Sequence, residues 1–346
     1  MKNKPKITFG IIVLNGEPFI RYNLRALYPF AHEIIVVEGA TQFASKIATQ
    51  DGHSVDGTLE TIQRFKKEED PDGKITIVTA EMEGHSSGFW PGEKDEQSQA
   101  YACRVSGDYL WQIDSDEFYL KEDMEKIIGL LHEDQSISGI SFKTITFFGS
   151  IKYVVKGYYL LSGAGNYRRL FKWQPGYQYV THRPPTVLDE KNNDLYSGNW
   201  VHAHDKKLKG ITLLHYSLVF PQQVKFKAMY YNSYKPYIYQ PLYWFKKSYI
   251  ELQWAFRYHN VYMYRSWLER YVGHTPVVVK QMIEDIQSNC IVIDTRKNSD
   301  IEKLLDSYLY NTQRLFWETV CLISLIGRPI RRYLVRLLRR LLCRTR

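Results

Sequence analysis

The sequence contains few cysteines and no apolar run long enough to cross a membrane. Its 346 residues include four cysteines, whose spacing matches no metal-binding or redox motif. We therefore expect a reduced, cytoplasmic chain. The apolar stretch 315–326 is interrupted by Glu318 and is too short to span a bilayer. The short apolar run after the basic residues 2–6 is predicted to be a strand, not a signal peptide.

Acidic residues and lysine are nearly absent from residues 314–346. This segment holds nine arginines, one glutamate and no lysine, so it carries +8 of the formal net charge of +9. The rest of the chain is close to neutral, which argues against a nucleic-acid footprint spread over the main domain.

The composition is that of a globular protein, with 44% hydrophobic and 24% charged residues. Aromatic residues are abundant, and many of them fall within 216–271. No internal repeat or low-complexity segment interrupts the chain. We predict three parts: a main domain over 1–220, a helical aromatic-rich subdomain over 221–313 and a basic amphipathic segment over 314–346.

Strand and helix patterns alternate through the first 131 residues. Continuous β-branched runs predict strands, and capping residues with helical spacing predict the helices between them. This order is typical of an α/β fold with a mainly parallel sheet and helices on both faces. The predicted strands are 7–14, 33–38, 75–78 and 109–113, and the predicted helices are 18–28, 58–69, 93–105 and 121–131.

Polar residues follow three of these predicted strands. Asn15 and Glu17 follow the first, Glu38 ends the second, and the fourth runs directly into residues 114–117, Asp-Ser-Asp-Glu. Ligands of parallel α/β sheets bind beyond the carboxyl ends of the strands. We therefore expect these side chains to meet at one edge of the sheet.

Asp114 and Asp116 form the most specific of these polar groups. On an extended segment, two residues separated by one position point to the same side, and carboxylate oxygens suit Mg²⁺ or Mn²⁺. The alternative is a capped turn that leads into the helix predicted from residue 121. The position at the end of an apolar strand favours the metal site.

These features together resemble a GT-A-fold glycosyltransferase of the family 2 type. The resemblance covers about the first 120 residues and rests on Asn15-Gly-Glu17, on Glu38, on Ser54-x-Asp56-Gly-Thr58 and on the segment 102–117. It implies that Glu38 binds a nucleoside, with a UDP-sugar favoured as donor. It also implies that Asp114 contacts ribose or metal, that Asp116 is a metal ligand, and that Asn15, Glu17 and Gln99 belong to the donor site.

A weaker resemblance extends into residues 168–217. Arg169 lies in an Arg-Arg-Leu-Phe segment and either contacts phosphate or forms an internal salt bridge. His182 is a catalytic candidate, but the acid that follows this histidine in the family is replaced by Arg183. Asp189 and Glu190 are the nearest acids and therefore the candidates for the base. His215 completes the metal site by resemblance, with a structural histidine as the alternative.

The resemblance implies a metal-dependent glycosyltransferase that moves a sugar, with inversion, from a nucleotide-sugar donor to a lipid-linked or cell-surface glycan acceptor. Two other classes remain open. A metal-dependent phosphohydrolase would use the same acids with His202, His204 and His215. A non-catalytic scaffold that binds glycans or membranes would explain why Arg183 stands in place of an acid.

The segment 330–342 predicts an amphipathic helix. Its apolar residues recur with helical spacing, and arginines fill most of the remaining positions. Such a helix is suited to the surface of an anionic membrane, which places the protein peripherally on the inner, cytoplasmic face. A helix docked on the protein itself or on a partner is the alternative. Residues 327–329, Gly-Arg-Pro, are expected to separate it from the apolar stretch before it.

Overall fold

The computed structural model describes residues 3–92, 94–234 and 240–342, and the side chains of 328–342 lie outside this description. Its strands are β1 (Ile7–Val13), β2 (Glu33–Glu38), β3 (Ile75–Val78), β4 (Tyr109–Asp114), β5 (Glu117–Phe118), β6 (Gly139–Phe148), β7 (Ser150–Gly157), β8 (Asn166–Lys172), β9 (Gln178–His182), β10 (Pro185–Leu188), β11 (Trp200–Val201), β12 (Leu213–Leu218) and β13 (Ser266–Arg270). Its helices are α1 (Phe19–Leu27), α2 (Thr58–Glu68), α3 (Asp95–Ala102), α4 (Lys121–Glu133), α5 (Pro221–Tyr234), α7 (Pro241–Trp244), α8 (Val277–Gln287), α9 (Ser299–Asp306) and α10 (Tyr308–Leu342).

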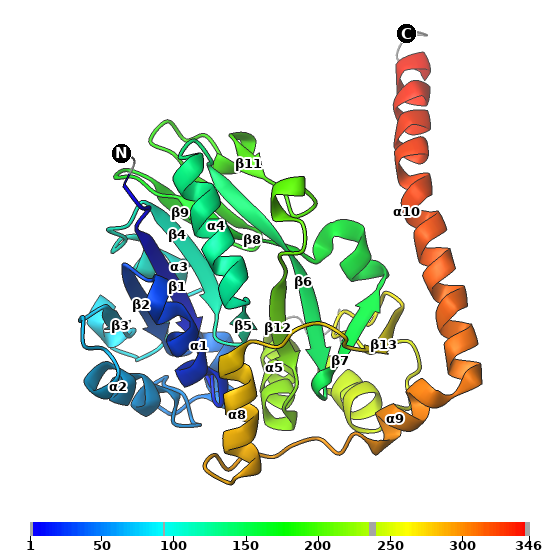
Figure 1. Cartoon of the computed structure of the whole chain (residues 1–346), viewed down its shortest axis with the longest axis horizontal. Helices are drawn as coiled ribbons and strands as arrows, with labels where there is room; N and C mark the ends of the chain where they lie inside the picture. Colours follow the sequence, from blue (N-terminus) through cyan, green and yellow to red (C-terminus); the bar gives the residue numbers. More distant parts are fainter. Residues whose placement is uncertain (1–2, 93, 235–239, 343–346) are drawn as a thin grey trace.

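The centre of the molecule is a sheet with the strand order β3-β2-β1-β4-β8-β6-β7-β13 (Figure 1). Strand β1 pairs in parallel with β2 and β4, and β2 pairs in parallel with β3. From β8 onward the strands along this path pair antiparallel. The predicted α/β architecture is therefore confirmed, and each element predicted up to residue 131 begins and ends within three residues of its expected bounds.

Both faces of the parallel half are buried. In β1, Phe9 and Ile11 pack into the core that also contains side chains of α1, α2 and α4, whereas Ile12 packs into the core of α3. Successive side chains of a strand point to opposite faces, so an uninterrupted apolar run places helices on both sides. The polar residues that follow such a strand therefore lie beyond its carboxyl end and not within the apolar core.

The region 221–313 contributes to the main sheet as well as forming helices. Strand β13 lies in this region and pairs antiparallel with β7, so the sheet extends across the boundary predicted at residue 220. Many of the aromatic side chains here are buried together in one core, as the large apolar area of their rings favours. Its fully buried members include Trp244, Tyr249, Tyr258 and Trp267.

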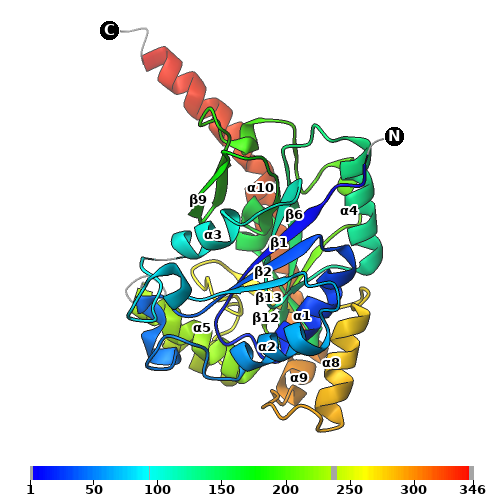
Figure 2. The ribbon, with the colours of Figure 1, turned by 90° about the vertical axis from the view of Figure 1, so that its left-hand side faces the viewer.

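Helix α10 is continuous over 35 residues, so the expected separation at residues 327–329 is wrong. A proline inside a helix removes one backbone hydrogen bond, but the leucines, isoleucines and arginines around it are compatible with helix on both sides. The helix runs past α9 and β13, and its C-terminal half extends beyond the body of the molecule (Figures 1 and 2). None of the helices within the described ranges is long and apolar enough to cross a membrane.

Candidate active site

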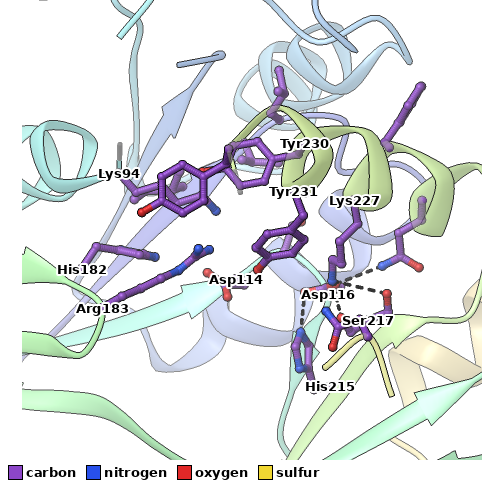
Figure 3. Close-up of a pocket in the computed structure, with 18 of the residues that line it drawn as sticks. Lys94, Asp114, Asp116, His182, Arg183, His215, Ser217, Lys227, Tyr230 and Tyr231 are labelled. Carbon is purple, nitrogen blue, oxygen red and sulfur yellow. Dashed lines mark hydrogen bonds and ion pairs between the residues drawn. The ribbon is translucent and has the colours of Figure 1, made fainter. Parts of the chain in front are cut away.

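The carboxyl ends of β1 and β4 open into a cavity of about 890 Å³. Residues that follow these strands lie on one side of it, and α5 lies on the other (Figure 3). Because cationic side chains outnumber carboxylates in its lining, the cavity suits an anionic ligand. The charged lining residues are Lys94, Arg168, Arg169, Arg183 and Lys227, with Asp95, Asp114 and Asp116.

Asp114, Glu117 and Arg169 form a buried ion group that we call the floor. Arg169 of β8 donates a hydrogen bond of 2.8 Å to Asp114 and a second one to Glu117. Arg169 and Glu117 are almost completely buried. Burial alone would raise the pKa of Asp114, but Arg169 holds it well below its usual value. Arg169 is thus engaged by carboxylates of the chain itself.

Asp116 is surrounded by residues that lie about 100 positions later in the chain. Its Oδ1 lies 3.4 Å from Nε2 of His215, and its Oδ2 accepts a hydrogen bond of 3.0 Å from Gln223. The Nζ of Lys227 lies 3.6 Å from the same Oδ2. Burial opposes ionisation, but His215 and Lys227 lower the pKa of Asp116. We call α5, with Gln223 and Lys227 on it, the wall.

Strand pairing explains why His215 reaches the predicted acidic motif. Strand β12 lies between β6 and the short β5, with His215 opposite Glu117. The Nδ1 of His215 is buried and finds no hydrogen-bond partner among the described residues, whereas Nε2 faces Asp116. This arrangement brings together Asp116 and His215, two of the three predicted metal ligands.

The donor set fits a hard divalent cation by chemistry, although the side chains do not yet converge. Within the described ranges, no three His, Cys, Asp or Glu side chains are gathered closely enough to hold a metal. Asp114 is turned toward Arg169, and Asp116 is shared by His215 and Lys227. The carboxylates of Asp114 and Asp116, with Nε2 of His215, are nevertheless ligands that suit Mg²⁺ or Mn²⁺.

Glu17 and Glu38 bind the loop before α2 and the helix itself, and neither lines the cavity. Glu38 is fully buried, and its carboxylate accepts hydrogen bonds from the backbone N–H of Ser54 at 2.8 Å and from its hydroxyl at 2.7 Å. Nδ1 of His53 lies 2.7 Å from the other oxygen. Glu17 accepts from the hydroxyl of Thr61, and burial raises its pKa. Both acids therefore hold the loop and α2 in place.

Asn15 lines the cavity and also fixes its rim. Its Nδ2 donates to the carbonyl of Ile47 at 2.7 Å, and its Oδ1 accepts from the backbone N–H of Val55 at 2.8 Å. Its φ of 55° lies in the left-handed region, which asparagine tolerates better than most residues. Asn15 thus joins the end of β1 to the loop that Glu38 anchors.

Gln99 faces away from the main cavity. Its amide donates to the carbonyl of Tyr179, and it lines a separate small depression together with His85 and Trp90. The neighbouring Ser98 lies closer to the site, because its hydroxyl is 3.0 Å from Nδ1 of His182.

His182 lines the cavity at the end of β9 and is almost completely buried. The hydroxyl of Ser98 donates to the carbonyl of Lys94 at 2.9 Å and also lies 3.0 Å from Nδ1 of His182. Burial, reinforced by Lys94, lowers the pKa of His182 well below its usual value. The ring is therefore a neutral proton acceptor that lies near Lys94 and Arg183 (Figure 3).

The two acids predicted as base candidates lie outside the cavity. Asp189 and Glu190 follow β10, and Oδ1 of Asp189 accepts backbone hydrogen bonds from Lys191 and Asn193, both at 2.8 Å. Asp189 thus closes a turn at the surface. The carboxylate that the sequence reasoning missed is Asp95, which lines the cavity and accepts a hydrogen bond of 2.6 Å from the backbone N–H of His182.

The other histidine pair does not join this site. His202 and His204 stack on each other with their ring centroids 5.8 Å apart, and neither lines the cavity. The histidine cluster that a phosphohydrolase would need is therefore not assembled around Asp114 and Asp116 in the described part of the chain.

The wall adds residues that sequence reasoning assigned only to a subdomain. Lys227, Tyr230, Tyr231 and Tyr234 all line the cavity, and Arg183 from the β9–β10 turn lies over the ring of Tyr231 at 5.8 Å. Their spacing of three, four and seven positions places them on one face of a helix. This helical spacing was the sequence signal from which their shared position could have been predicted.

Comparison with known proteins gives limited similarity. No protein-family model and no curated protein matches the chain. Among solved structures, TarS of S. aureus (residues 1–349) is 15% identical over 41% of this chain and 36% of its own, with a TM-score of 0.29. Glucosyl-3-phosphoglycerate synthase of Mycobacterium tuberculosis, in a complex with Mn²⁺ and UDP, is 19% identical over 42% of this chain and 44% of its own, also with a TM-score of 0.29. The chain thus spans less than half of the length of these proteins.

Proposed function

We propose that the protein is a metal-dependent glycosyltransferase that uses a nucleotide-sugar donor, with a UDP-sugar favoured. The observation that carries this proposal is the position of Asp114 and Asp116. They lie at the carboxyl end of a central parallel strand, in a cavity whose other charged groups are mostly cationic. Acids alone would repel a diphosphate, whereas acids that hold a cation among lysines and arginines attract it.

Asp116, Asp114 and His215 would hold Mg²⁺ or Mn²⁺, which supplies charge stabilisation for the diphosphate leaving group. Lys94 and Lys227 lie where they can add to this stabilisation, because both line the same cavity. Nε2 of His182 accepts the proton of the attacking hydroxyl. The negative charge of the bound diphosphate favours the protonated ring that this proton transfer forms, and Asp95 positions the histidine by accepting a hydrogen bond from its backbone N–H. The sugar is transferred with inversion.

Asp116→Asn tests this function. We expect at least about a hundredfold loss of Mn²⁺-dependent donor hydrolysis and sugar transfer, because a charged ligand at the leaving group is lost. The matched control is Asp108→Asn. Asp108 lies at the opposite end of the same strand, is exposed and accepts a hydrogen bond from the backbone of Lys6. Equal activities of both variants and the unaltered protein would refute the proposal.

Thermal-shift measurements with UDP-, GDP- and CDP-sugars and Mn²⁺ identify the donor. Stabilisation by one base in preference to the others is the expected result, since a ligand that binds only the folded state raises the melting temperature. Absence of donor-specific stabilisation would favour a scaffold. Phosphate release from simple esters without an acceptor would favour a phosphohydrolase.

The acceptor side of the proposal is a lipid-linked or cell-surface glycan at an anionic membrane. Helix α10 supports it with an exposed apolar stripe that includes Leu309, Phe316 and Ile323, which are 66%, 60% and 65% exposed. Residues seven positions apart lie on nearly the same side of a helix. Tyr310 and Cys321 pack against the body from another side of the helix, so the stripe faces away from the body.

Charge favours a membrane over a second copy of the chain as the occupant of this stripe. Residues 314–346 carry nine arginines and one glutamate, and two such helices side by side would repel each other. An anionic lipid surface attracts them, by about 1 kcal/mol for each arginine near the surface. The side chains of 330–342, on which the membrane prediction from the sequence rests, lie outside the described residues. The proposed location is peripheral, on the cytoplasmic face.

Sedimentation with lipid vesicles tests the stripe. Vesicles with anionic phosphatidylglycerol should bind the protein, and purely zwitterionic vesicles should bind it weakly. Leu309→Ser combined with Phe316→Ser and Ile323→Ser should abolish binding, because apolar contact with the acyl chains is lost. The control replaces Val272 and Val292 with serine, since these apolar residues are exposed elsewhere. A concentration-dependent dimer without vesicle binding would contradict the membrane assignment.

A further inference from the structure

Lys227 occupies a central position between the wall and the acidic motif. Its Nζ donates to the hydroxyl of Ser217, lies 3.3 Å from the carbonyl of Ser217 and 3.6 Å from Oδ2 of Asp116 (Figure 3). Its side chain is 25% exposed. Lys227 is therefore a cation held beside Asp116, the carboxylate that is proposed as a metal ligand.

The surroundings of Asp116 leave little room for a second cation. Oδ2 is taken by Gln223 and Lys227 from α5, and Oδ1 lies against His215. A divalent cation bound to Asp116 would share this carboxylate with the Lys227 ammonium, and like charges that share one carboxylate repel each other. The lysine and the metal therefore cannot both stay close to this carboxylate.

We propose that Lys227 occupies the place of the divalent cation on Asp116 and yields this position when the metal binds. The lysine chain has four flexible methylene groups and lines the cavity. Its displaced ammonium is directed to the diphosphate that arrives with the metal. Lys227 thus neutralises Asp116 before the metal binds and the donor diphosphate afterwards. This second half, but not the exchange itself, rests on the proposed donor function.

The exchange also links metal loading to the wall. Tyr230 and Tyr231 follow Lys227 by three and four positions, so they lie on the same side of α5 and line the same cavity. Release of Lys227 from Asp116 removes one of the contacts that join α5 to the acidic motif, and the Gln223 contact remains. The aromatic side of the cavity is therefore freer to adjust once the metal is bound.

Direct metal titration tests the exchange without any sugar donor. Binding of Mn²⁺ to the full-length protein is measured by calorimetry and by the electron paramagnetic resonance signal of free Mn²⁺. Lys227→Met should bind Mn²⁺ roughly tenfold more tightly than the unaltered protein, because the competing positive charge is gone. Lys227→Arg keeps the charge and should bind Mn²⁺ about as weakly as the unaltered protein.

Lys225→Met is the matched control. Lys225 is on the same helix, but it is exposed and does not line the cavity. Its loss should leave Mn²⁺ affinity unchanged. Unchanged affinity in Lys227→Met, or an equal gain in Lys225→Met, would overturn the proposal. Circular dichroism of each variant verifies the fold, and Lys227→Arg provides the second comparison if the methionine variant is unfolded.

Binding of UDP in EDTA tests the second half. Without a metal, Lys227→Met should bind UDP several-fold more weakly than Lys225→Met, because a charge-assisted contact to phosphate is lost. Tighter Mn²⁺ binding without binding of any nucleotide would uphold the exchange and refute the donor function. Nucleotide binding without a change in Mn²⁺ affinity would do the reverse.

Discussion

The floor and the wall hold two carboxylates of one motif in different ways. Asp114 is held by Arg169, a buried residue of the central sheet that also binds the buried Glu117. Asp116 is held by Lys227, a partly exposed residue of a helix that covers the cavity. The planar guanidinium binds two carboxylates at once, whereas the ammonium is a mobile point charge. Arg169 of the floor is therefore expected to keep its carboxylate partners, whereas Lys227 of the wall is the cation that is proposed to exchange.

The two regions also differ in what their removal would leave behind. If Arg169 is lost, the buried Glu117 and the partly exposed Asp114 lose the cation that joins them. If Lys227 is lost, Asp116 retains Gln223 and His215 and remains in contact with the cavity. The cost of an unpaired charge rises with burial, so the floor should dominate stability and the wall should dominate ligand binding.

Arg169→Met should give the largest effect on folding. We expect the free energy of unfolding, measured by urea denaturation at pH 7, to fall by about 3–5 kcal/mol, because the fully buried Glu117 and the partly exposed Asp114 lose their shared partner. Lys227→Met should lower it by about 1 kcal/mol, as is typical of partly exposed ion pairs. The control is Arg168→Met, whose side chain lies over Tyr196 and 3.9 Å from Asp194. Similar losses in all three variants would remove the distinction between floor and wall.

The strands that carry the floor were predictable from the sequence, because they depend on local patterns. Continuous apolar runs placed β1, β2 and β4 in the sheet and Asp114 at the end of β4. Asp116 follows in a turn and not on the extended segment that the two-residue spacing assumed. The ion pair of Arg169 was one of two stated alternatives. It occurs because β8 pairs with β4, which brings Arg169 next to the end of that strand.

The wall was not predictable in the same way. Its contacts with Asp116 depend on β12 pairing with β5 and β6, across about 100 and about 70 residues of sequence respectively. The inward contacts of Glu38 depend on how the loop before α2 folds back onto β2, which no periodicity specifies. Proximity in sequence was also misleading for Asp189, which closes a surface turn, while Asp95 reaches His182 from a distant helix.

Replacement of His259 should give the next largest effect on stability. This histidine lines the cavity on the side nearest the wall. Burial, with His215 and Lys227 nearby, lowers its pKa to about 3. Below about pH 6.5 the unfolded chain therefore binds a proton at this histidine that the folded protein does not bind. The contribution of the neutral ring to the free energy of unfolding is present above this pH and is lost as the pH falls. Nδ1 of His259 accepts a hydrogen bond of 3.1 Å from Val261, which asparagine can replace without titrating.

Urea denaturation at pH 7 and pH 5 measures this contribution. The unaltered protein should lose about 2 kcal/mol more than His259→Asn over this interval, from roughly 1.4 kcal/mol per pH unit below 6.5. His182 is also kept neutral by burial, so some acid sensitivity should remain. The exposed His274, replaced by asparagine, is the control. Identical pH dependence of both variants would contradict the buried neutral state of His259.

Ser217→Ala should give the smallest effect and separates the two regions most directly. Ser217 is buried and accepts a hydrogen bond from Lys227, so its loss should cost about 1 kcal/mol. In the Lys227→Met background the same change should cost almost nothing, which gives a coupling energy of about 1 kcal/mol between the two residues. Ser217→Ala combined with Arg169→Met should instead be additive within about 0.5 kcal/mol. If the coupling energy between Ser217 and Arg169 were as large as that between Ser217 and Lys227, the floor and the wall would act as one unit. Metal exchange at Asp116 would then also disturb the ion group of Arg169.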